Sequence, residues 1–485
     1  MDANEIYKVA FSGDEKPYYF LPFRFKKKNN KYLLVNDLGD YIWLDANDFH
    51  ALINYRIDKN SSIYKDLITR FFVIDDDSHG NIEQIVIRYR TKKAFLLSFT
   101  KLHIFVLTLR CNLRCTYCQV SRKNIDANKQ KYDMNEEIAR KSVDLMFKSN
   151  AKDISVEVQG GEPLLNFDIL KFIVEYSKKQ NRLYNKNIHY TLVTNLYEIE
   201  EEIITFLKHN NFYVSVSIDG PSFLHNLNRR APNGDSYERL KINLENLIGE
   251  LGAEHIAGLL TVTRSHLHYP KEVIDEYIQL GLNSIFIRPL NTFGFAKNIL
   301  ESIHYSVEEF LSFYKGAIQY IVSLNKSGIR FVERYSQILL HSILTPFASS
   351  FVDLSSPCGA GIGQIVYNYN GDVFTCDEGR MLGEMGDYTF RLGNVLQNSY
   401  DEIFLSDKLQ IICMSSCNEC LPGCSDCVYQ PYCGVCPVYN YYTQGSIFGN
   451  FSTNNRCKLH EGLFDYFFDL LDSSSAPILE SFVKF

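Results

Sequence analysis

The stretch TLRCNLRCTYCQVSR, from Thr108 to Arg122, contains three closely spaced cysteines, Cys111, Cys115 and Cys118. Thiolates are soft ligands that suit zinc ions and iron–sulfur clusters. Zinc prefers paired Cys-x2-Cys units and a closed tetrahedral shell. Three cysteines can instead hold three corners of a 4Fe–4S cube and leave one iron open to a ligand from outside the protein. The alternative is a zinc loop whose fourth ligand is His103 or a more distant side chain.

Around this stretch, apolar runs alternate with helical patterns from about residue 100 to residue 290. Near-continuous apolar strands separated by helices indicate parallel strands that are covered on their outer face. Six such units predict an α/β fold, an open and partial (β/α)6 barrel, which binds ligands at the carboxyl ends of its strands. The predicted strands cover 103–109, 154–159, 188–194, 213–218, 256–262 and 284–290, and the predicted helices cover 135–148, 167–178, 198–209, 237–251 and 270–280.

The composition narrows the function classes. A chain of 485 residues is expected to form about two or three domains. A net charge of -7 and a pI near 6.0 argue against general attraction to nucleic-acid phosphates. Residues 1–19 lack a signal-peptide pattern and no apolar run is long enough to span a bilayer, so we expect a cytoplasmic protein without a membrane partner. In that compartment 13 cysteines favour metal or redox chemistry over disulfides.

Small and polar residues follow the next strands of the predicted barrel. The motif QGGEP, 159–163, ends the second strand, where paired glycines let the backbone approach a ligand and Glu162 can accept hydrogen bonds from an ammonium group. Asn195 ends the third strand. After the fourth strand, Asp219 could bind a ribose hydroxyl and Arg229 a carboxylate. Each motif alone is a routine turn, but together they offer partners for an amino acid and a nucleoside.

These motifs together resemble the radical S-adenosylmethionine (radical SAM) superfamily over roughly residues 100–300: Cys-x3-Cys-x2-Cys with Tyr117 before the last cysteine, GGEP after the second strand, and SIDG, 217–220, after the fourth. In that family the methionine part of S-adenosylmethionine chelates the open iron through its amino and carboxylate groups. The resemblance therefore implies that the missing fourth ligand is the cosubstrate. The implied cofactor-binding residues are Tyr117, Gln159, Gly160, Gly161, Glu162, Asn195, Ser217, Asp219 and Arg229.

The ten cysteines after residue 357 resemble the SPASM extension of peptide-modifying radical enzymes. The resemblance implies one auxiliary cluster at Cys424, Cys427, Cys433 and Cys457, and three corners of another at Cys358, Cys376 and Cys436. Two departures stand out: only two residues separate Cys433 from Cys436, where the family usually has three, and no cysteine lies just upstream of Cys358. The cluster at Cys358 is thus either open or completed by Cys413, Cys417 or Cys420. A zinc ribbon is the alternative for this region.

Asp377 directly follows Cys376. In the related sulfatase maturases an aspartate after the corresponding cysteine serves as a base, which implies a catalytic role for Asp377. A carboxylate beside an anionic cluster resists ionisation, so its pKa should rise toward a useful range. Glu378 is the nearest competitor, and the alternative is that Asp377 is only a hairpin residue.

The segments outside the predicted barrel have different sequence patterns. In residues 1–95, KYLLVNDLGDYIWLD (31–45) predicts a hairpin. A helix capped between Asp45 and Asp48 is predicted to begin near Phe49, and a second helix to cover 62–72. This unit resembles the winged-helix leader-recognition module of peptide-maturation systems; a plain accessory domain is the alternative. Further predictions are two connecting helices in 301–350, the auxiliary-cluster domain in 351–465, an aromatic-rich core helix in 463–471 and a C-terminal tail in 466–485.

Four more stretches narrow the resemblance to the His-Xaa-Ser-system radical SAM maturases: LPFRF (21–25), QGGEPLLNF (159–167), IVYNYNGDVF (365–374) and RMLGEMGD (380–387). This implies reductive cleavage of S-adenosylmethionine to a 5′-deoxyadenosyl radical that abstracts hydrogen from a ribosomally made precursor peptide or small protein. Flavodoxin or ferredoxin would donate the electrons. The alternatives are a radical enzyme acting on RNA or a small metabolite, formylglycine formation as in sulfatase maturases, and a non-enzymatic zinc-binding interaction protein.

Overall fold

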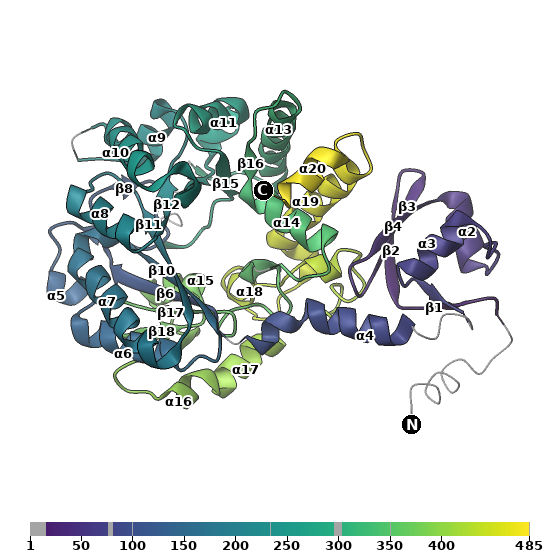
Figure 1. Ribbon diagram of the computed structural model, residues 1–485, viewed down its shortest axis with the longest axis horizontal. Helices are drawn as coiled ribbons and strands as arrows, with labels where there is room; N and C mark the ends of the chain where they lie inside the picture. The colour runs from purple at the N-terminus through teal and green to yellow at the C-terminus, as the bar shows by residue number, and fades with distance from the viewer. Residues whose placement is uncertain are drawn as a thin grey trace.

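The computed structural model describes residues 16–75, 81–98, 100–232, 234–294, 303–349 and 351–484. A small N-terminal unit stands at one end of a larger body, and helix α4 (Asn81–Lys92) runs between them (Figure 1). The expected absence of a signal peptide concerns residues that lie mostly outside the described part of the chain. Among the helices of the described residues, none combines the length and hydropathy that a membrane span requires.

Six parallel strands form the curved sheet of the body, and each pairs with the strand that precedes it in the barrel. Their near-continuous apolar residues are buried because the sheet is covered by helices, as at Val158, Leu192 and Val216. All six predicted strands are confirmed. They are β6 (Leu102–Thr108), β10 (Asp153–Gly160), β11 (Asn187–Thr194), β12 (Tyr213–Ser217), β14 (Ile256–Thr261) and β15 (Ser284–Arg288).

Helices on the outside of this sheet complete the predicted partial (β/α)6 barrel (Figure 1). Side chains at their starts accept backbone hydrogen bonds, Asn135 from Ile138 and Asp235 from Glu238, which satisfies otherwise unpaired N–H groups. The longest of these covering helices, α7, continues past its predicted end at residue 178 and ends at Tyr184. These covering helices are α6 (Glu136–Phe147), α7 (Phe167–Tyr184), α8 (Glu201–His209), α10 (Ser236–Leu251) and α11 (Pro270–Gln279).

The sheet continues beyond the barrel on both sides. Next to β15 lies β16 (Val332–Glu333), and next to β6 lies β17 (Gln364–Tyr367), with Val366 opposite Ile104. The antiparallel strands β18 (Asp372–Phe374) and β19 (Arg391–Asn394) extend the same sheet. The hairpin before Cys376 is therefore present as predicted, but it also belongs to the barrel sheet, a lateral pairing that the sequence pattern does not reveal.

The C-terminal residues are part of the body's core. The connecting helices α13 (Val307–Lys326) and α14 (Arg334–Leu344) agree with the prediction for 301–350. The predicted tail at 466–485 is wrong, because α19 (Asn455–Leu471) crosses that boundary and α20 (Ala476–Phe482) follows it. Their apolar side chains are buried against α13 and α14, so the aromatic-rich core helix predicted over 463–471 is confirmed as part of α19. These side chains are Phe467, Phe468, Leu479 and Phe482.

The N-terminal unit has a small core of its own. Its antiparallel sheet contains β2 (Phe23–Lys28), β3 (Lys31–Asn36) and β4 (Tyr41–Asp45), and the last two form the predicted hairpin. Helix α2 (Ala46–Ile53) begins before Phe49 because the Asp45 side chain accepts from Asp48 N and caps it there. Helix α3 (Ser62–Thr69) ends before the predicted residue 72. Strands β1 (Tyr19–Phe20) and β5 (Val73–Ile74) pair beside this sheet.

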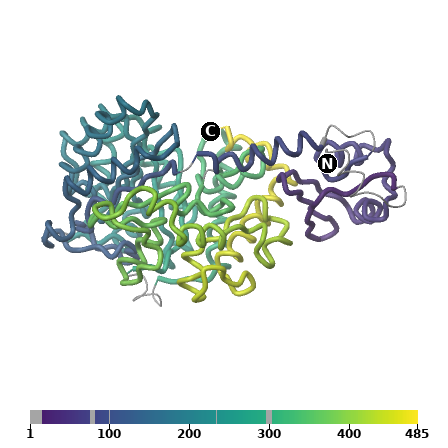
Figure 2. Tube along the Cα trace, turned by 90° about the horizontal axis from the view of Figure 1, so that it is seen from below, coloured from purple at the N-terminus to yellow at the C-terminus, as the bar shows by residue number. Residues whose placement is uncertain are grey.

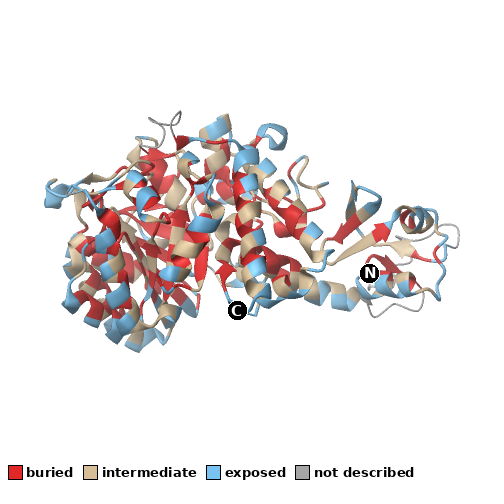
Figure 3. Cartoon of the chain, turned by 90° about the horizontal axis from the view of Figure 1, so that it is seen from above, coloured by how far each residue is buried: buried red, intermediate tan, exposed pale blue. Residues whose placement is uncertain are grey.

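The two units meet along one elongated molecule (Figure 2). Buried residues fill the interior of the body, and a smaller group lies in the N-terminal unit (Figure 3). Three lysines of the N-terminal sheet face α19, where Lys26 Nζ lies 2.9 Å from Asp465, Lys28 Nζ 2.6 Å from Asp469 and Lys31 Nζ 2.6 Å from Asp472. The N-terminal unit therefore docks on the C-terminal helices through opposite charges.

Candidate active site

The loop that carries Cys111, Cys115 and Cys118, hereafter the cluster loop, follows β6 at the carboxyl rim of the barrel. Short pairings hold both of its arms: β7 (Arg110–Cys111) pairs with β9 (Lys123–Asn124), and β8 (Arg114–Cys115) pairs with β13 (Arg229–Arg230). Cys111 and Cys118 are buried and Cys115 is half-buried. The three thiols are thus presented from a loop that is fixed at its entrance and at its middle.

A buried ion pair, which the sequence did not reveal, fixes the entrance of the cluster loop. Arg110 Nε and Nη2 donate to the two carboxylate oxygens of Asp133 at 2.8 and 2.7 Å, and Thr108 Oγ1 donates to the same carboxylate at 2.6 Å. Such a two-point contact sets geometry as well as charge. Only the fold brings the two residues together, since they are separated by the whole loop.

The surroundings of the three thiols fit an anionic metal cluster. Burial raises the pKa of Cys111 and Cys115, the latter to about 12, and neighbouring thiols raise both further. Crowded thiols of this kind ionise readily only beside a cation. Asn195 Nδ2 lies 3.6 Å from Cys111 Sγ and Arg229 Nη1 3.8 Å from Cys115 Sγ, so donors already face the sulfurs.

The zinc alternative finds no support at His103. This residue begins β6, at the end opposite the cluster loop, and both of its ring nitrogens have partners, Tyr367 Oη at 3.0 Å and the Thr100 carbonyl at 3.2 Å. Among the described residues, no three His, Cys, Asp or Glu side chains converge as ligands of one metal ion. Cluster ligands lie further apart because several irons separate them.

The two glycines of QGGEP approach the protein's own backbone closely. A Cβ on Gly160 would collide with the Thr108 carbonyl, and one on Gly161 with the Arg110 carbonyl. The resulting contact lets Gly161 N donate to Thr108 O and Glu162 N to Arg110 O, both at 2.8 Å. The two glycines therefore bring β10 against the cluster loop.

Glu162 is buried and held by three donors from the rim. Its carboxylate accepts from Thr194 Oγ1 at 2.9 Å, Asn195 N at 2.9 Å and Leu164 N at 3.2 Å. Burial raises its pKa to about 7 despite these donors. A carboxylate has about four lone-pair sites, so one site is left after these three donors. Nearby, Gln159 Nε2 is buried without a partner among the described residues, and Ser217 ends β12 half-buried.

Asp219 supports two other predicted residues instead of facing a ribose. Its carboxylate is fully buried and accepts from Tyr117 Oη at 2.8 and 2.7 Å, while Arg229 Nε lies 3.2 Å from Oδ2. Burial opposes the charge of Arg229, but Asp219 and Tyr117 raise its pKa above the ordinary value. The arginine is therefore held as a cation between Asp219 and the Cys115 sulfur.

The C-terminal cysteines form the two groups that the resemblance implied. The first auxiliary group, Cys358, Cys376 and Cys436, shares a buried apolar cluster. Cys376 Sγ accepts from Gly379 N at 3.3 Å at the start of α15 (Asp377–Glu384), and Cys436 Sγ from Tyr439 N at 3.4 Å at the start of α18 (Pro437–Gln444). Helix N-termini stabilise thiolates, so these positions suit cluster ligands.

Arg380, near the first auxiliary group in sequence, has two buried donors without a partner among the described residues. It lies one helical turn after Cys376, and its side chain is completely buried. Its Nε donates to Asp377 Oδ1 at 2.8 Å, but Nη1 and Nη2 have no partner among the described residues. Buried donors of this kind cost free energy unless they are satisfied.

The second auxiliary group contains Cys424, Cys427, Cys433 and Cys457. Burial raises the pKa of Cys433 well above the ordinary value, and the other three thiols raise it further, which places all four together. His460, which the sequence did not single out, lies with Nδ1 3.3 Å from Cys433 Sγ. Burial lowers the pKa of His460 to about 3, so the ring is neutral.

A cavity of about 360 Å³ opens where the barrel rim meets the C-terminal domain. Glu378 lines it, whereas Asp377 is paired with Arg380 beside it. Asp377 instead acts on Glu157 of β10, whose pKa is raised to about 7 by burial and then by the charge of Asp377. Other charged and polar residues of the lining are Arg288, Asn291, Asp353, Arg456 and His460.

Two domain models match the chain. The radical SAM superfamily model matches residues 105–268, and the iron–sulfur cluster-binding SPASM model matches residues 358–428. The cluster loop lies inside the first match, and Cys358, Cys376, Cys424 and Cys427 lie inside the second. The predicted domain types and the enzyme class are thereby confirmed.

Relatives and solved structures agree with these matches. The cysteine-type anaerobic sulfatase-maturating enzyme of Clostridium perfringens (strain 13 / Type A) is 27% identical over 74% of this chain and 94% of its own length. Native anSMEcpe with bound AdoMet and Cp18Cys peptide superimposes with a TM-score of 0.64 at 23% identity, covering 78% of this chain and 99% of its own. Streptococcus suis SuiB bound to precursor peptide SuiA gives 0.54 at 15% identity, covering 89% and 98%. These likenesses support the fold.

Proposed function

We propose that this chain, an enzyme with a radical SAM domain and an iron–sulfur SPASM domain, matures a ribosomally made precursor peptide or small protein. The observation that carries the proposal is the cavity between the end of β15 and the C-terminal domain, which Glu378 lines two residues after Cys376. Solved proteins of the same fold contain AdoMet with a peptide, or a precursor peptide. A His-Xaa-Ser repeat protein is the substrate that the sequence resemblance favours.

Residues of the barrel rim would bind the cosubstrate. Cys111, Cys115 and Cys118 would hold a 4Fe–4S cluster, which with S-adenosylmethionine supplies a 5′-deoxyadenosyl radical. Glu162 would accept a hydrogen bond from the methionine ammonium group at its remaining lone-pair site. Gln159 Nε2 would donate to the cosubstrate and so gain the hydrogen-bond partner that it lacks among the described residues. The buried rim excludes water from the reacting carbon.

Residues of the cavity would receive the substrate side chain. Arg456 Nη2 lies 2.5 Å from Asp353 Oδ2. Together with Arg288 and Glu378, this pair places both positive and negative charges on the cavity wall. Such a lining suits a polar residue whose peptide backbone needs hydrogen-bond partners. We assign proton removal to Glu378, because it lines the cavity, and an electrostatic influence to Asp377.

The auxiliary groups would take up the electron that the substrate radical releases. Cys358, Cys376 and Cys436 lie against the cavity side of the domain, since Glu378 is two residues from Cys376. The second auxiliary group lies nearer the N-terminal unit, because Cys433 shares a cavity with Arg24. A flavodoxin or ferredoxin would complete the electron path.

The N-terminal unit would bind the precursor away from the reacting residue. Among the described strands, β2 and β4 each pair on one side only, so each offers an edge to which a peptide strand can add. Tethering raises the local concentration of the modified region, and a weak contact in the cavity then suffices.

Co-expression with a small protein encoded beside this chain, followed by tandem mass spectrometry, tests the proposal. We expect a mass change confined to the precursor and production of 5′-deoxyadenosine by the purified enzyme. Cys115→Ala is the matched control, because it removes one cluster ligand from a loop held by backbone pairing. Modified RNA with an unmodified precursor, or a normal deoxyadenosine yield from Cys115→Ala, would overturn the proposal.

A further inference from the structure

Three cysteines remain outside the sites described above. Cys413, Cys417 and Cys420 repeat the Cys-x3-Cys-x2-Cys spacing of the cluster loop within the C-terminal domain. The sequence offers them as ligands for the first auxiliary group. However, Cys358, Cys376 and Cys436 share a buried apolar cluster that contains none of these three cysteines, and Cys420 is exposed.

Local geometry places the three cysteines on successive turns at the end of one helix. They leave the end of α17 (Asp407–Met414) through successive tight turns, in which Cys417 N donates to Met414 O at 3.3 Å and Cys420 N to Cys417 O at 3.0 Å. Cys417 Sγ lies 3.4 Å from the Cys413 carbonyl. Burial raises the pKa of Cys413, and Cys417 raises it further; Glu419 and Cys420 act on Cys417 in the same way.

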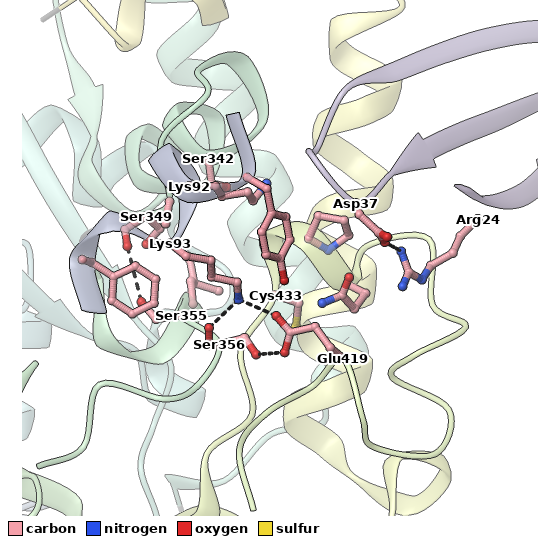
Figure 4. A pocket seen from close by; sticks show the side chains of 16 residues that line it. Arg24, Asp37, Lys92, Lys93, Ser342, Ser349, Ser355, Ser356, Glu419 and Cys433 are labelled. Carbon is pink, nitrogen blue, oxygen red and sulfur yellow. Dashed lines mark hydrogen bonds and ion pairs between the residues drawn. The ribbon is translucent and has the colours of Figure 1, made fainter. Parts of the chain in front are cut away.

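This loop touches both auxiliary groups. Ser416 Oγ accepts from Cys358 N at 3.0 Å, and Asn418 Nδ2 donates to the Cys433 carbonyl at 2.6 Å. Glu419 lines a cavity of about 240 Å³ together with Cys433, and Lys93 bridges Glu419 and Ser356 there (Figure 4). The loop is therefore rigidly connected to the buried ligands, while Cys420 itself is exposed.

We propose that Cys413, Cys417 and Cys420 bind a further iron–sulfur cluster at the surface, with one position open to a ligand from outside the protein. Spacing and soft ligands favour a cluster. Among the described residues, neither these three cysteines nor those of the cluster loop converge as ligands of a single metal ion. This site is additional to the clusters that the proposed function uses, and its test requires neither a precursor nor turnover.

Metal analysis of the anaerobically reconstituted full chain tests the inference. With four sites filled, we expect about sixteen irons per chain and matching sulfide, and about twelve in the triple variant C413A/C417A/C420A. Deoxyadenosine yield should not change, because the cluster loop is untouched. The matched control is I411A/M414A, since both side chains are exposed, 51% and 68%, on the same segment.

Three results would overturn the inference: equal iron in the wild type and the triple variant, loss of stoichiometric zinc instead of iron, or a Cys417–Cys420 disulfide in protein kept anaerobic. If the triple variant does not fold, the exposed single variant Cys420→Ser replaces it. The reduced single variant should then lose or change one component of the electron paramagnetic resonance spectrum and keep the others. An unchanged spectrum would refute the site.

Discussion

At the level of single residues, Asp219 connects the cluster loop to the fourth barrel strand through Tyr117 and Arg229. Asp219→Asn would leave the buried Arg229 without its counter-charge, which costs about 3–5 kcal/mol. We expect a lower unfolding temperature and a raised KM for S-adenosylmethionine. Glu198→Gln is the control, because its pair with Arg239 is about half exposed and should contribute at most about 1 kcal/mol. Equal effects of the two variants would contradict the role of Asp219.

Glu378 and Asp377 can be separated by paired substitutions. Glu378→Gln should still permit deoxyadenosine formation in the presence of precursor, but lower the product yield by roughly 10²–10⁴-fold, because proton removal fails. Asp377→Asn should retain most of the product, since Asp377 is paired with Arg380. Product and deoxyadenosine are measured together by liquid chromatography. The reverse pattern would identify Asp377 as the proton acceptor, as the sequence predicted.

Lys92 gives the stability a defined pH dependence. Burial lowers its pKa to about 8 from 10.5, so below pH 8 the fold holds a charge that the unfolded chain solvates better. This penalty disappears as the pH rises from 8 to 10.5. Lys92→Met should therefore raise the free energy of unfolding at pH 7 by about 1–3 kcal/mol, and with it the unfolding temperature. At pH 10 the gain should be small. The exposed Lys65→Met serves as control; a pH-independent gain for Lys92→Met would contradict this account.

At the level of elements, the contact between β2 and α19 holds the N-terminal unit on the body. The lysine side chains at 26 and 28 alternate with Lys27, which points to the other face of the strand. K26E/K28E/K31E should repel the acidic face of α19 and increase proteolysis between residues 75 and 100. Lys27→Glu, which makes the same charge change per substituted residue but on the opposite face, should not. Identical digestion of both variants would show that the ion pairs do not hold the contact.

At the level of the whole molecule, the N-terminal unit should separate precursor recognition from radical chemistry. A chain that starts near Thr100 keeps the barrel and all 13 cysteines, so it should still cleave S-adenosylmethionine. It should lose precursor binding and processing, because the strand edges of β2 and β4 are gone. Iron content verifies that the shortened chain is folded. If it modifies the precursor as well as the full chain, residues 1–95 do not recognise a leader.

Much of the architecture could be predicted because its signals are local. The six strands, their helices and the cluster loop depend on apolar periodicity and on cysteine spacing within a few residues. The hairpin before Cys376 and the connecting helices were predictable for the same reason. The core helix over 463–471 was predictable from its aromatic pattern, whereas the tail prediction failed at α20, whose Leu479 and Phe482 are buried.

The amino-acid sequence by itself determined the cluster loop, the rim motifs and the grouping of the auxiliary cysteines, since each depends on short spacings that any fold must respect. Tertiary structure alone decided the pairing of Arg110 with Asp133, the extension of the barrel sheet by β17, and the place of Glu378 in the cavity. It also placed the Asp219 carboxylate, which the sequence offered as a partner of a ribose hydroxyl, against Tyr117 and Arg229. The physical reason is that buried ion pairs and lateral strand pairing join residues far apart in the chain, and their free energy depends on burial, which no local pattern encodes.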